Sequence, residues 1–263
     1  MYPYEIIDFH AHIYPQKIAD KAVGAISEFY HIKMHGKGTS EHLLQKGKEI
    51  GVSRYVVHSV ATTPAQVVSI NNFIAEEVKK HPQFIGFATL HPGFLDIPSE
   101  VDRAIDMGLC GIKVHPDFQE FNIDDEAAWK IYRAIQGRLP ILFHMGDETR
   151  DFSAPRRLRN VLEKFPNLTA IGAHFGGYHA WEDSRKYLTD QNIYMDTSSS
   201  LFRLSPEEAA QMIRDHGPEK MLFGTDYPMW DHEEELSRFL ALPLTEQERG
   251  LILGKNAKAL LGI

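Results

Sequence analysis

Eight short apolar runs, each followed by an amphipathic segment, constrain the fold of this chain more than any other feature. Most of the runs are continuous stretches of Val, Ile, Leu, Phe and Ala, which is typical of parallel strands covered on both faces. They span residues 5–10, 54–60, 84–90, 111–115, 140–145, 168–174, 193–198 and 221–226. Eight such strands alternating with helices predict an α/β protein, a (β/α)8 TIM barrel.

The segments between the runs have the spacing and caps of helices. Residues 64–80 place apolar side chains at near-helical spacing, and residues 99–107, 153–164, 205–216 and 245–253 each begin with Ser or Thr, the residues preferred at N-caps. A doubly wound open sheet is the alternative, but no glycine-rich phosphate fingerprint follows the first run. Without a linker or low-complexity segment, residues 1–263 are predicted to form a single barrel domain of the metal-dependent hydrolase type.

Composition limits the partners. The chain has 263 residues and a net charge of −8, which argues against nucleic acid because a polyanion needs a basic face. Its single cysteine, Cys110, excludes an intramolecular disulfide and suits a reducing cytosol. The start, MYPY, lacks the features of a signal peptide, and no apolar run is long enough to cross a bilayer. We therefore expect a cytoplasmic protein that binds a small molecule and no membrane.

Histidines gather at the ends of the predicted strands. His10 and His12 end the first run, and residues two apart in a strand point the same way, so they form half of a divalent metal site. Further strand-end residues are His115, His144, His174 and Asp226, whereas His58 and His91 are interpreted as core or loop histidines. In a barrel these ends meet at one mouth, where several imidazoles and a carboxylate are best explained by a bound cation.

Five short motifs, in order along the chain, resemble those of one family. They are IDFHAH (7–12), FHMG (143–146), GAHFGG (172–177), GTDYP (224–228) and GKNAKALL (254–261). The chain resembles the amidohydrolase superfamily, in particular the amidohydrolase-related branch that includes aminocarboxymuconate-semialdehyde decarboxylase. The resemblance runs from the first predicted strand to the last helix.

This resemblance implies residue roles. One divalent ion would be held by His10, His12, His144 and Asp226, with zinc favoured and manganese, iron or cobalt as alternatives. His174 would orient or deprotonate the bound water or meet the substrate, and Asp226 would also carry a proton. The resemblance is also compatible with a homodimer.

Other residues are candidates for contacts with the substrate. Lys113 is expected to be an ammonium group that binds a substrate carboxylate, although in binuclear relatives a lysine at this strand is carboxylated and bridges two ions. The remaining candidates are His115, Arg150, Arg203, Tyr227 and Trp230. Asp8 is expected either to bond a ligand imidazole or to pair with strand backbone.

Two reactions are compatible with such a site. The first expectation is hydrolysis of an amide, ester or lactone of a small carboxylic acid by metal-activated water. The alternative is non-oxidative decarboxylation of a small aromatic or unsaturated acid, which the short segment after the first strand, residues 30–38, disfavours. A non-catalytic metal-binding barrel is a third hypothesis, and the presence of both His174 and Asp226 argues against it.

Overall fold

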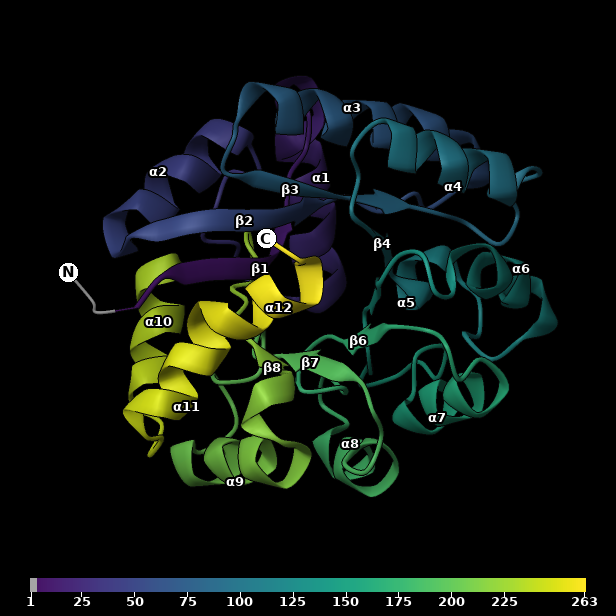
Figure 1. The fold of residues 1–263 in the computed structure, drawn as a ribbon. Coiled ribbons are helices and arrows are strands. Elements are labelled where there is room, and N and C mark those ends of the chain that lie inside the picture. Colours follow the sequence, from purple (N-terminus) through teal and green to yellow (C-terminus); the bar gives the residue numbers. More distant parts are fainter. Residues whose placement is uncertain (1–3) are drawn as a thin grey trace. The chain divides into compact units, whose positions relative to one another are not determined.

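A computed structural model describes residues 4–263 and contains eight parallel strands in the order β1-β2-β3-β4-β5-β6-β7-β8 (Figure 1). The expectation of no signal peptide rests on the start MYPY, and the first three of these residues lie outside the described residues. The strands are β1 (Ile6–His12), β2 (Val52–His58), β3 (Phe84–Thr89), β4 (Gly111–Val114), β5 (Ile141–Phe143), β6 (Ala170–Gly172), β7 (Tyr194–Asp196) and β8 (Met221–Leu222). Strand order and alternation with helices confirm the predicted (β/α)8 class.

Helices follow the strands as predicted. They are α1 (Gln16–Tyr30), α2 (Ser40–Ile50), η1 (Pro64–Gln66), α3 (Val67–Lys80), α4 (Ile97–Asp106), α5 (Pro116–Gln119), α6 (Glu126–Ile135), α7 (Pro155–Lys164), α8 (Trp181–Leu188), α9 (Pro206–His216), η2 (Pro218–Lys220), α10 (His232–Leu240), α11 (Glu246–Gly250), the π-helical η3 (Leu251–Lys255) and α12 (Asn256–Leu261). In residues 4–263, none of these helices has the length and apolar character needed to cross a membrane.

Two of the predicted helix caps are wrong. Helix α4 begins earlier than expected, because the side chain of Asp96 accepts the backbone N–H of Ser99 and is the N-cap. At α7 the residue Ser153 does not cap the helix; its hydroxyl donates instead to Asp117. The caps at α9 and α11 are confirmed, and each forms a reciprocal capping box with a glutamate three residues later.

The chain divides into two compact units, and each is described by itself. Unit 1 comprises the chain up to His58, His81–Ile85 and Thr197–Ile263. In it β1 pairs with β2, and the backbone N–H of Phe9 donates to the carbonyl of Phe223 just after β8. Helix α2 packs against α10 and β2, and η3 packs against β1 and β8. Unit 1 therefore brings the first and last strands together.

The C-terminal motif of unit 1 has a structural role. The side-chain amide of Asn256 donates to the carbonyls of Pro218 and Met221, both at 2.7 Å. The π-helical turn before it leaves the carbonyl of Ile252 free to accept the N–H of Phe223 at 3.0 Å. These bonds satisfy backbone groups at both ends of the two-residue strand β8. The motif therefore holds the strand from which the loop carrying Asp226 departs.

Unit 2 comprises Ser59–Lys80 and Gly86–Asp196. The strands β3 to β7 pair in parallel and in sequence order, and helix pairs α4–α6 and α7–α8 pack against each other. Strands β5, β6 and β7 have three residues each, and every residue in β5 and β6 is buried. Polar side chains of unit 2 therefore begin directly after very short apolar strands.

Candidate metal and catalytic site

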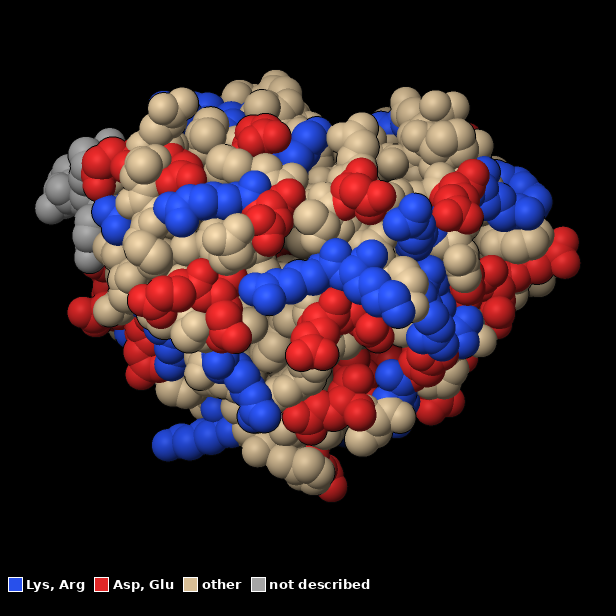
Figure 2. Space-filling view, turned by 90° about the horizontal axis from the view of Figure 1, so that it is seen from below, with Lys and Arg blue, Asp and Glu red and all other residues tan. Residues whose placement is uncertain are grey.

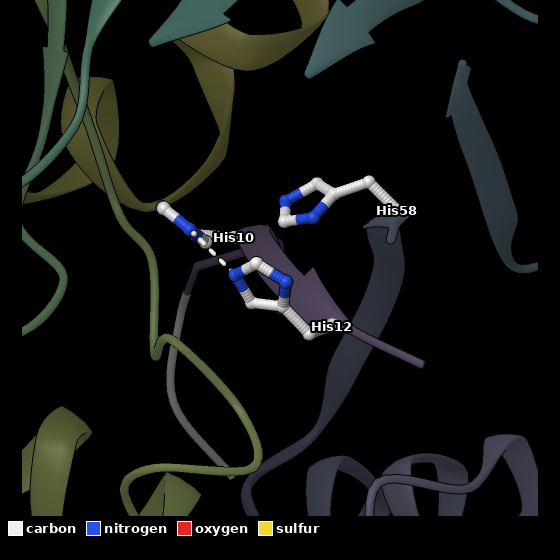
Figure 3. A group of neighbouring side chains, drawn as sticks. All are labelled: His10, His12 and His58. Carbon is white, nitrogen blue, oxygen red and sulfur yellow. Dashed lines mark hydrogen bonds between the residues drawn. The ribbon is translucent and has the colours of Figure 1, made fainter. Parts of the chain in front are cut away.

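In unit 1 the two histidines of β1 meet a carboxylate of the β8 loop. Nε2 of His10 lies 3.3 Å from Nε2 of His12, and Oδ1 of Asp226 lies 3.3 Å from the first nitrogen and 3.4 Å from the second. Figure 3 shows the two imidazoles turned toward each other from the same strand. Ligand atoms around a tetrahedral zinc ion are about 3.3–3.4 Å apart, because zinc–nitrogen bonds are about 2.0–2.1 Å long. The three atoms therefore have the chemistry and the spacing of a ligand set.

Hydrogen bonding alone explains this cluster poorly. Two imidazole nitrogens at 3.3 Å can share only one proton, and the carboxylate oxygen lies equally close to both. The three residues are buried, with exposed fractions of 0% for His10, 9% for His12 and 8% for Asp226. A cation in the centre would use all three lone pairs at once.

His58, interpreted from the sequence as a core histidine, belongs to the same cluster. It ends β2 and is fully buried, with its ring centroid 5.0 Å from that of His10 and 4.4 Å from that of His12 (Figure 3). Its ligand atom lies within 4.8 Å of those of the other two histidines. For His91 the loop interpretation is confirmed, because its Nδ1 accepts the N–H of Gly93 at 2.9 Å.

Asp8 pairs with the strand backbone rather than with a ligand imidazole. Oδ1 of Asp8 accepts the backbone N–H groups of His10 and Thr225, and Oδ2 accepts the hydroxyl of Thr225 at 2.7 Å. Nε2 of the buried His232 lies 3.1 Å from Oδ2. This carboxylate joins β1 to the β8 loop, so it fixes the distance between the two parts of the cluster.

The β8 loop is also held by the segment between α1 and α2. The hydroxyl of Tyr227 accepts the N–H of Gly38 at 3.1 Å and lies 3.0 Å from Nδ1 of His42. A Cβ at Gly36 would lie 2.3 Å from Cε2 of Tyr227, so only glycine allows this approach. The side chain of Arg203 is exposed, and Trp230 is buried with its indole N–H on Ser199 at 2.8 Å. Contacts of Tyr227, Arg203 and Trp230 with a substrate stay predictions.

Unit 2 brings together the histidines that follow β4, β5 and β6. Nδ1 of His144 lies 3.0 Å from Nε2 of His174, and the rings of His115 and His144 stack with centroids 3.7 Å apart. Nε2 of His144 lies 2.9 Å from the carbonyl of Gly146, which can only accept, so this nitrogen carries the proton. If His144 binds a metal, the ligand atom is therefore Nδ1.

Left-handed backbone conformations place these side chains. His174 has φ of 62°, and its backbone N–H donates to Oδ1 of Asp196 at 3.0 Å. Asp226 in unit 1 has φ of 57°. Non-glycine residues in this region are strained, and such strain is concentrated at functional sites. Gly146 has φ of 78°, and a Cβ there would lie 2.5 Å from the carbonyl oxygen of Tyr178, which explains the glycine of the FHMG motif.

Asp117 is a site residue that the sequence analysis missed. Together with His115 and His144 it forms a second group that could hold an ion, with Oδ2 3.9 Å from Nε2 of His144. Burial raises the pKa of Asp117 to about 7, opposed by the hydroxyl of Ser153, which donates to Oδ2 at 2.5 Å. Arg150 donates to the carbonyl of Asp117 at 2.6 Å. The signal in the sequence was an acidic residue two positions after a strand-end histidine.

The remaining candidate of unit 2 is Lys113, which is fully buried on β4. The ammonium state of Lys113 and the substrate contacts of Lys113, His115 and Arg150 stay predictions. On the face drawn in Figure 2, Lys and Arg residues are interspersed with Asp and Glu residues.

An eight-stranded (β/α)8 fold with buried histidine and carboxylate clusters after its strands defines the class of metal-binding barrel enzymes. Residues 7–263 match the family model described as amidohydrolase. The chain therefore belongs to the amidohydrolase family, and the resemblance seen in its motifs is confirmed.

Solved structures with this fold include several decarboxylases. An uncharacterized TIM-barrel protein from Bordetella bronchiseptica is 19% identical with a TM-score of 0.78, and the match covers 98% of each chain. A dihydroxybenzoic acid decarboxylase from Polaromonas sp. JS666, with bound manganese and the inhibitor 2-nitroresorcinol, is 18% identical with a TM-score of 0.76, covering 98% of this chain and 97% of that one. A 5-carboxyvanillate decarboxylase from Sphingomonas paucimobilis is 15% identical with a TM-score of 0.73, covering 98% and 99%.

A buried glutamate in unit 1 gives a pH-dependent prediction. Burial raises the pKa of Glu235 to about 8, despite its bond from Arg238. The folded protein therefore holds this proton more tightly than the unfolded chain, and stability falls as the pH rises from about 4.5 to 8. Replacing Glu235 by glutamine removes this loss, so we expect a gain of roughly 1–3 kcal/mol at pH 8.5 and little or none at pH 5, measured by thermal unfolding.

The neighbouring Glu234 is the matched control. Its carboxylate also accepts from Arg238, at 3.1 Å, but its side chain is 49% exposed. Glu234→Gln should therefore change the melting temperature equally at both pH values. If Glu235→Gln behaves in the same way, Glu235 is not protonated in the folded protein.

Proposed function

We propose that this chain is a metal-dependent enzyme that removes CO2 from a small aromatic or unsaturated carboxylic acid without oxidation. The observation that carries the proposal is that the two carboxylate oxygens of Asp226 make different contacts. Oδ1 faces the two imidazoles of β1, whereas Oδ2 accepts the hydroxyl of Ser199 at 2.5 Å. On this basis we propose decarboxylation before hydrolysis, the reverse of the first expectation from the sequence.

The three donor atoms of unit 1 fit a single ion. His10 and His12 would hold it through Nε2 and Asp226 through Oδ1, and His144 is the fourth proposed ligand, through Nδ1. A divalent ion supplies Lewis-acid chemistry, because it binds and polarises oxygen atoms of a substrate. The spacing in unit 1 favours zinc, and manganese is the alternative, supported by the ion in the Polaromonas decarboxylase.

Hydrolysis requires a base that takes a proton from the attacking water. His174 and Asp226 are the residues expected to handle this proton, but the second oxygen of Asp226 already accepts a hydrogen bond from Ser199, whose oxygen in turn accepts the indole N–H of Trp230. A hydrogen bond to a carboxylate stabilises its charged form and lowers its basicity. Asp226 is therefore better suited to hold a cation than to accept and release a proton in each turnover.

Decarboxylation makes a different demand on the chain. The bond between the carboxylate and its carbon breaks, the electron pair stays on that carbon, CO2 leaves, and a proton takes its place. His174 is the proposed donor of this proton, since an imidazole can carry a proton near neutral pH. Lys113 and Arg150 are the proposed groups that bind the anionic substrate. Small aromatic acids are supported as substrates by two solved structures with this fold, a 2,6-dihydroxybenzoate decarboxylase and a 5-carboxyvanillate decarboxylase.

Hydrolysis of an amide, ester or lactone is the second candidate. It is favoured by the family description and by the presence of both His174 and Asp226. The non-catalytic metal-binding barrel is the third. A small-molecule substrate, the absence of nucleic-acid and membrane partners, and a homodimer remain proposals for each of the three.

Metal removal and product analysis test the proposal. Purified protein, stripped with a chelator and reloaded with one equivalent of Zn2+ or Mn2+, is given dihydroxybenzoates and related acids, and separately lactones, esters and amides. We expect CO2 release with one solvent deuterium in the product in D2O, and a loss of at least about 100-fold after stripping. Acid release with oxygen-18 from labelled water would establish hydrolysis instead. If the protein binds metal but turns over neither the acids nor the lactones, esters and amides, the non-catalytic metal-binding barrel is supported.

A further inference from the structure

A run of four hydroxyl residues follows β7 and was not singled out in the sequence. Residues 197–200, Thr-Ser-Ser-Ser, are almost completely inaccessible, each with at most 1% of its surface exposed. Buried hydroxyl groups require hydrogen-bond partners, since an unpaired one costs about 1–3 kcal/mol. The partners of two of them are residues of the proposed metal site.

Ser198 contacts the imidazole of His10. Its Oγ lies 3.1 Å from Nδ1, on the side of the ring away from the nitrogen that faces His12 and Asp226. When Nδ1 donates its proton to Ser198, Nε2 keeps a lone pair that can bind a cation. The contact is therefore compatible with the tautomer of His10 that the ligand set needs, and it holds the ring in place.

Ser199 contacts the carboxylate of Asp226. Its hydroxyl donates to Oδ2 at 2.5 Å and accepts the indole N–H of Trp230 at 2.8 Å. The indole is itself fixed, because the ring of Phe202 stacks on it at 4.8 Å and the guanidinium of Arg238 lies 5.0 Å from its centroid. Ser199 has φ of 45°, a strained conformation for a residue with a Cβ, which the surrounding packing must maintain.

We infer that Ser198 and Ser199 are positioning residues that set the metal affinity of the site. Two consecutive hydroxyls contact two different proposed ligands, one the Nδ1 of His10 and the other the Oδ2 of Asp226. The inference rests on the proposed function, because it assumes the ligand set of unit 1. It goes beyond that function by assigning control of the ion to a loop that supplies no ligand.

Binding of the metal alone tests the inference. Chelator-stripped Ser198→Ala and Ser199→Ala proteins are titrated with Zn2+ and with Mn2+ by calorimetry and by competition with a coloured chelator. We expect affinity to fall about 10–100-fold in each, the usual cost of losing a group that orients a metal ligand. Ser200→Ala is the matched control, because Ser200 is equally buried but donates to the carbonyl of Ser198, and we expect its affinity to stay within about threefold of wild type.

Two further variants separate positioning from simple damage to the fold. Ser198→Thr keeps the hydroxyl and should restore most of the affinity lost in Ser198→Ala. Ser199→Cys keeps the approximate size but is a poor donor, so it should fold like wild type and still bind the ion more weakly. Far-ultraviolet circular dichroism and melting of the stripped proteins check that the fold is intact.

The outcomes are distinguishable. If wild-type protein binds neither ion, the proposed metal site fails and the inference fails with it. If wild type binds an ion and the two alanine variants, with Ser199→Cys, bind it equally well, the inference alone is overturned. If Ser200→Ala loses as much affinity as the other two, the effect belongs to packing of the loop and not to contact with the ligands.

Discussion

Replacement of His12 by alanine is expected to remove the bound ion and to lower turnover at least about 1,000-fold. Nε2 of His12 lies 3.3 Å from Nε2 of His10 and 3.4 Å from Oδ1 of Asp226, so its loss leaves the unit 1 cluster without one of its three closest donor atoms. A site that depends on three or four ligands does not hold an ion tightly when one is missing. Elemental analysis of protein purified without added metal, together with initial rates, measures both effects.

An exposed histidine of the same unit supplies the control. His31, which ends α1 in a left-handed conformation, lies on the surface. His31→Ala should retain about one equivalent of metal and near wild-type turnover. If His12→Ala retains its metal as well, the ligand set of unit 1 is wrong, even if activity is lost. A content near two ions in wild type would instead revive a carboxylated Lys113.

Replacement of His174 by alanine should lower turnover about 100- to 10,000-fold and leave the metal content nearly unchanged. The proposed role of His174 is to carry the proton, and its Nε2 faces Nδ1 of His144 at 3.0 Å. Its left-handed backbone is held by the carboxylate of Asp196, which positions the ring independently of any ion. Loss of a general acid or base removes a chemical step and not a ligand, so rate and metal content should separate.

His179 is a matched control for this variant. It lies five residues further along unit 2, is partly buried with φ of 57°, and its Nδ1 lies 3.0 Å from Oε1 of Glu148. His179→Ala therefore imposes a similar structural loss without removing the proposed proton carrier. Loss of the ion from His174→Ala would show that His174 is a ligand, and full activity would remove it from the mechanism.

The strands could be found from the sequence because each is a continuous apolar run, and burial on both faces demands such runs. Their ends were less predictable. The predicted run 221–226 contains a strand of only two residues, Met221–Leu222, because the chain leaves the sheet to place Asp226 in a left-handed turn. The pattern of apolar residues in a sequence indicates which residues are buried. Residues 223–226 are buried but are not part of a strand. Burial and strand pairing therefore coincide only in part.

For the candidate site, the sequence pointed to His10, His12 and Asp226, which the structure brings together, but not to the side chains that contact them. The pattern His-x-His on one strand fixes the direction of both side chains, so its geometry could be predicted. Ser198 and Ser199 carry no such signal, because serine is common in loops and their partners, His10 and Asp226, lie 188 and 27 positions away in the sequence. Asp117 was missed although it stands two positions after the strand-end histidine His115, because its burial cannot be read from the sequence.

The carboxylate of Asp8 and its partner Thr225 are separated by 217 positions in the chain. During synthesis the two histidines of β1 therefore exist long before the carboxylate that completes their cluster. Hydrogen bonds between β1 and the β8 loop close this long connection, and the entropic cost of closure grows only slowly with length. Asp226 can therefore join the two histidines only after the last strand of the chain has been made.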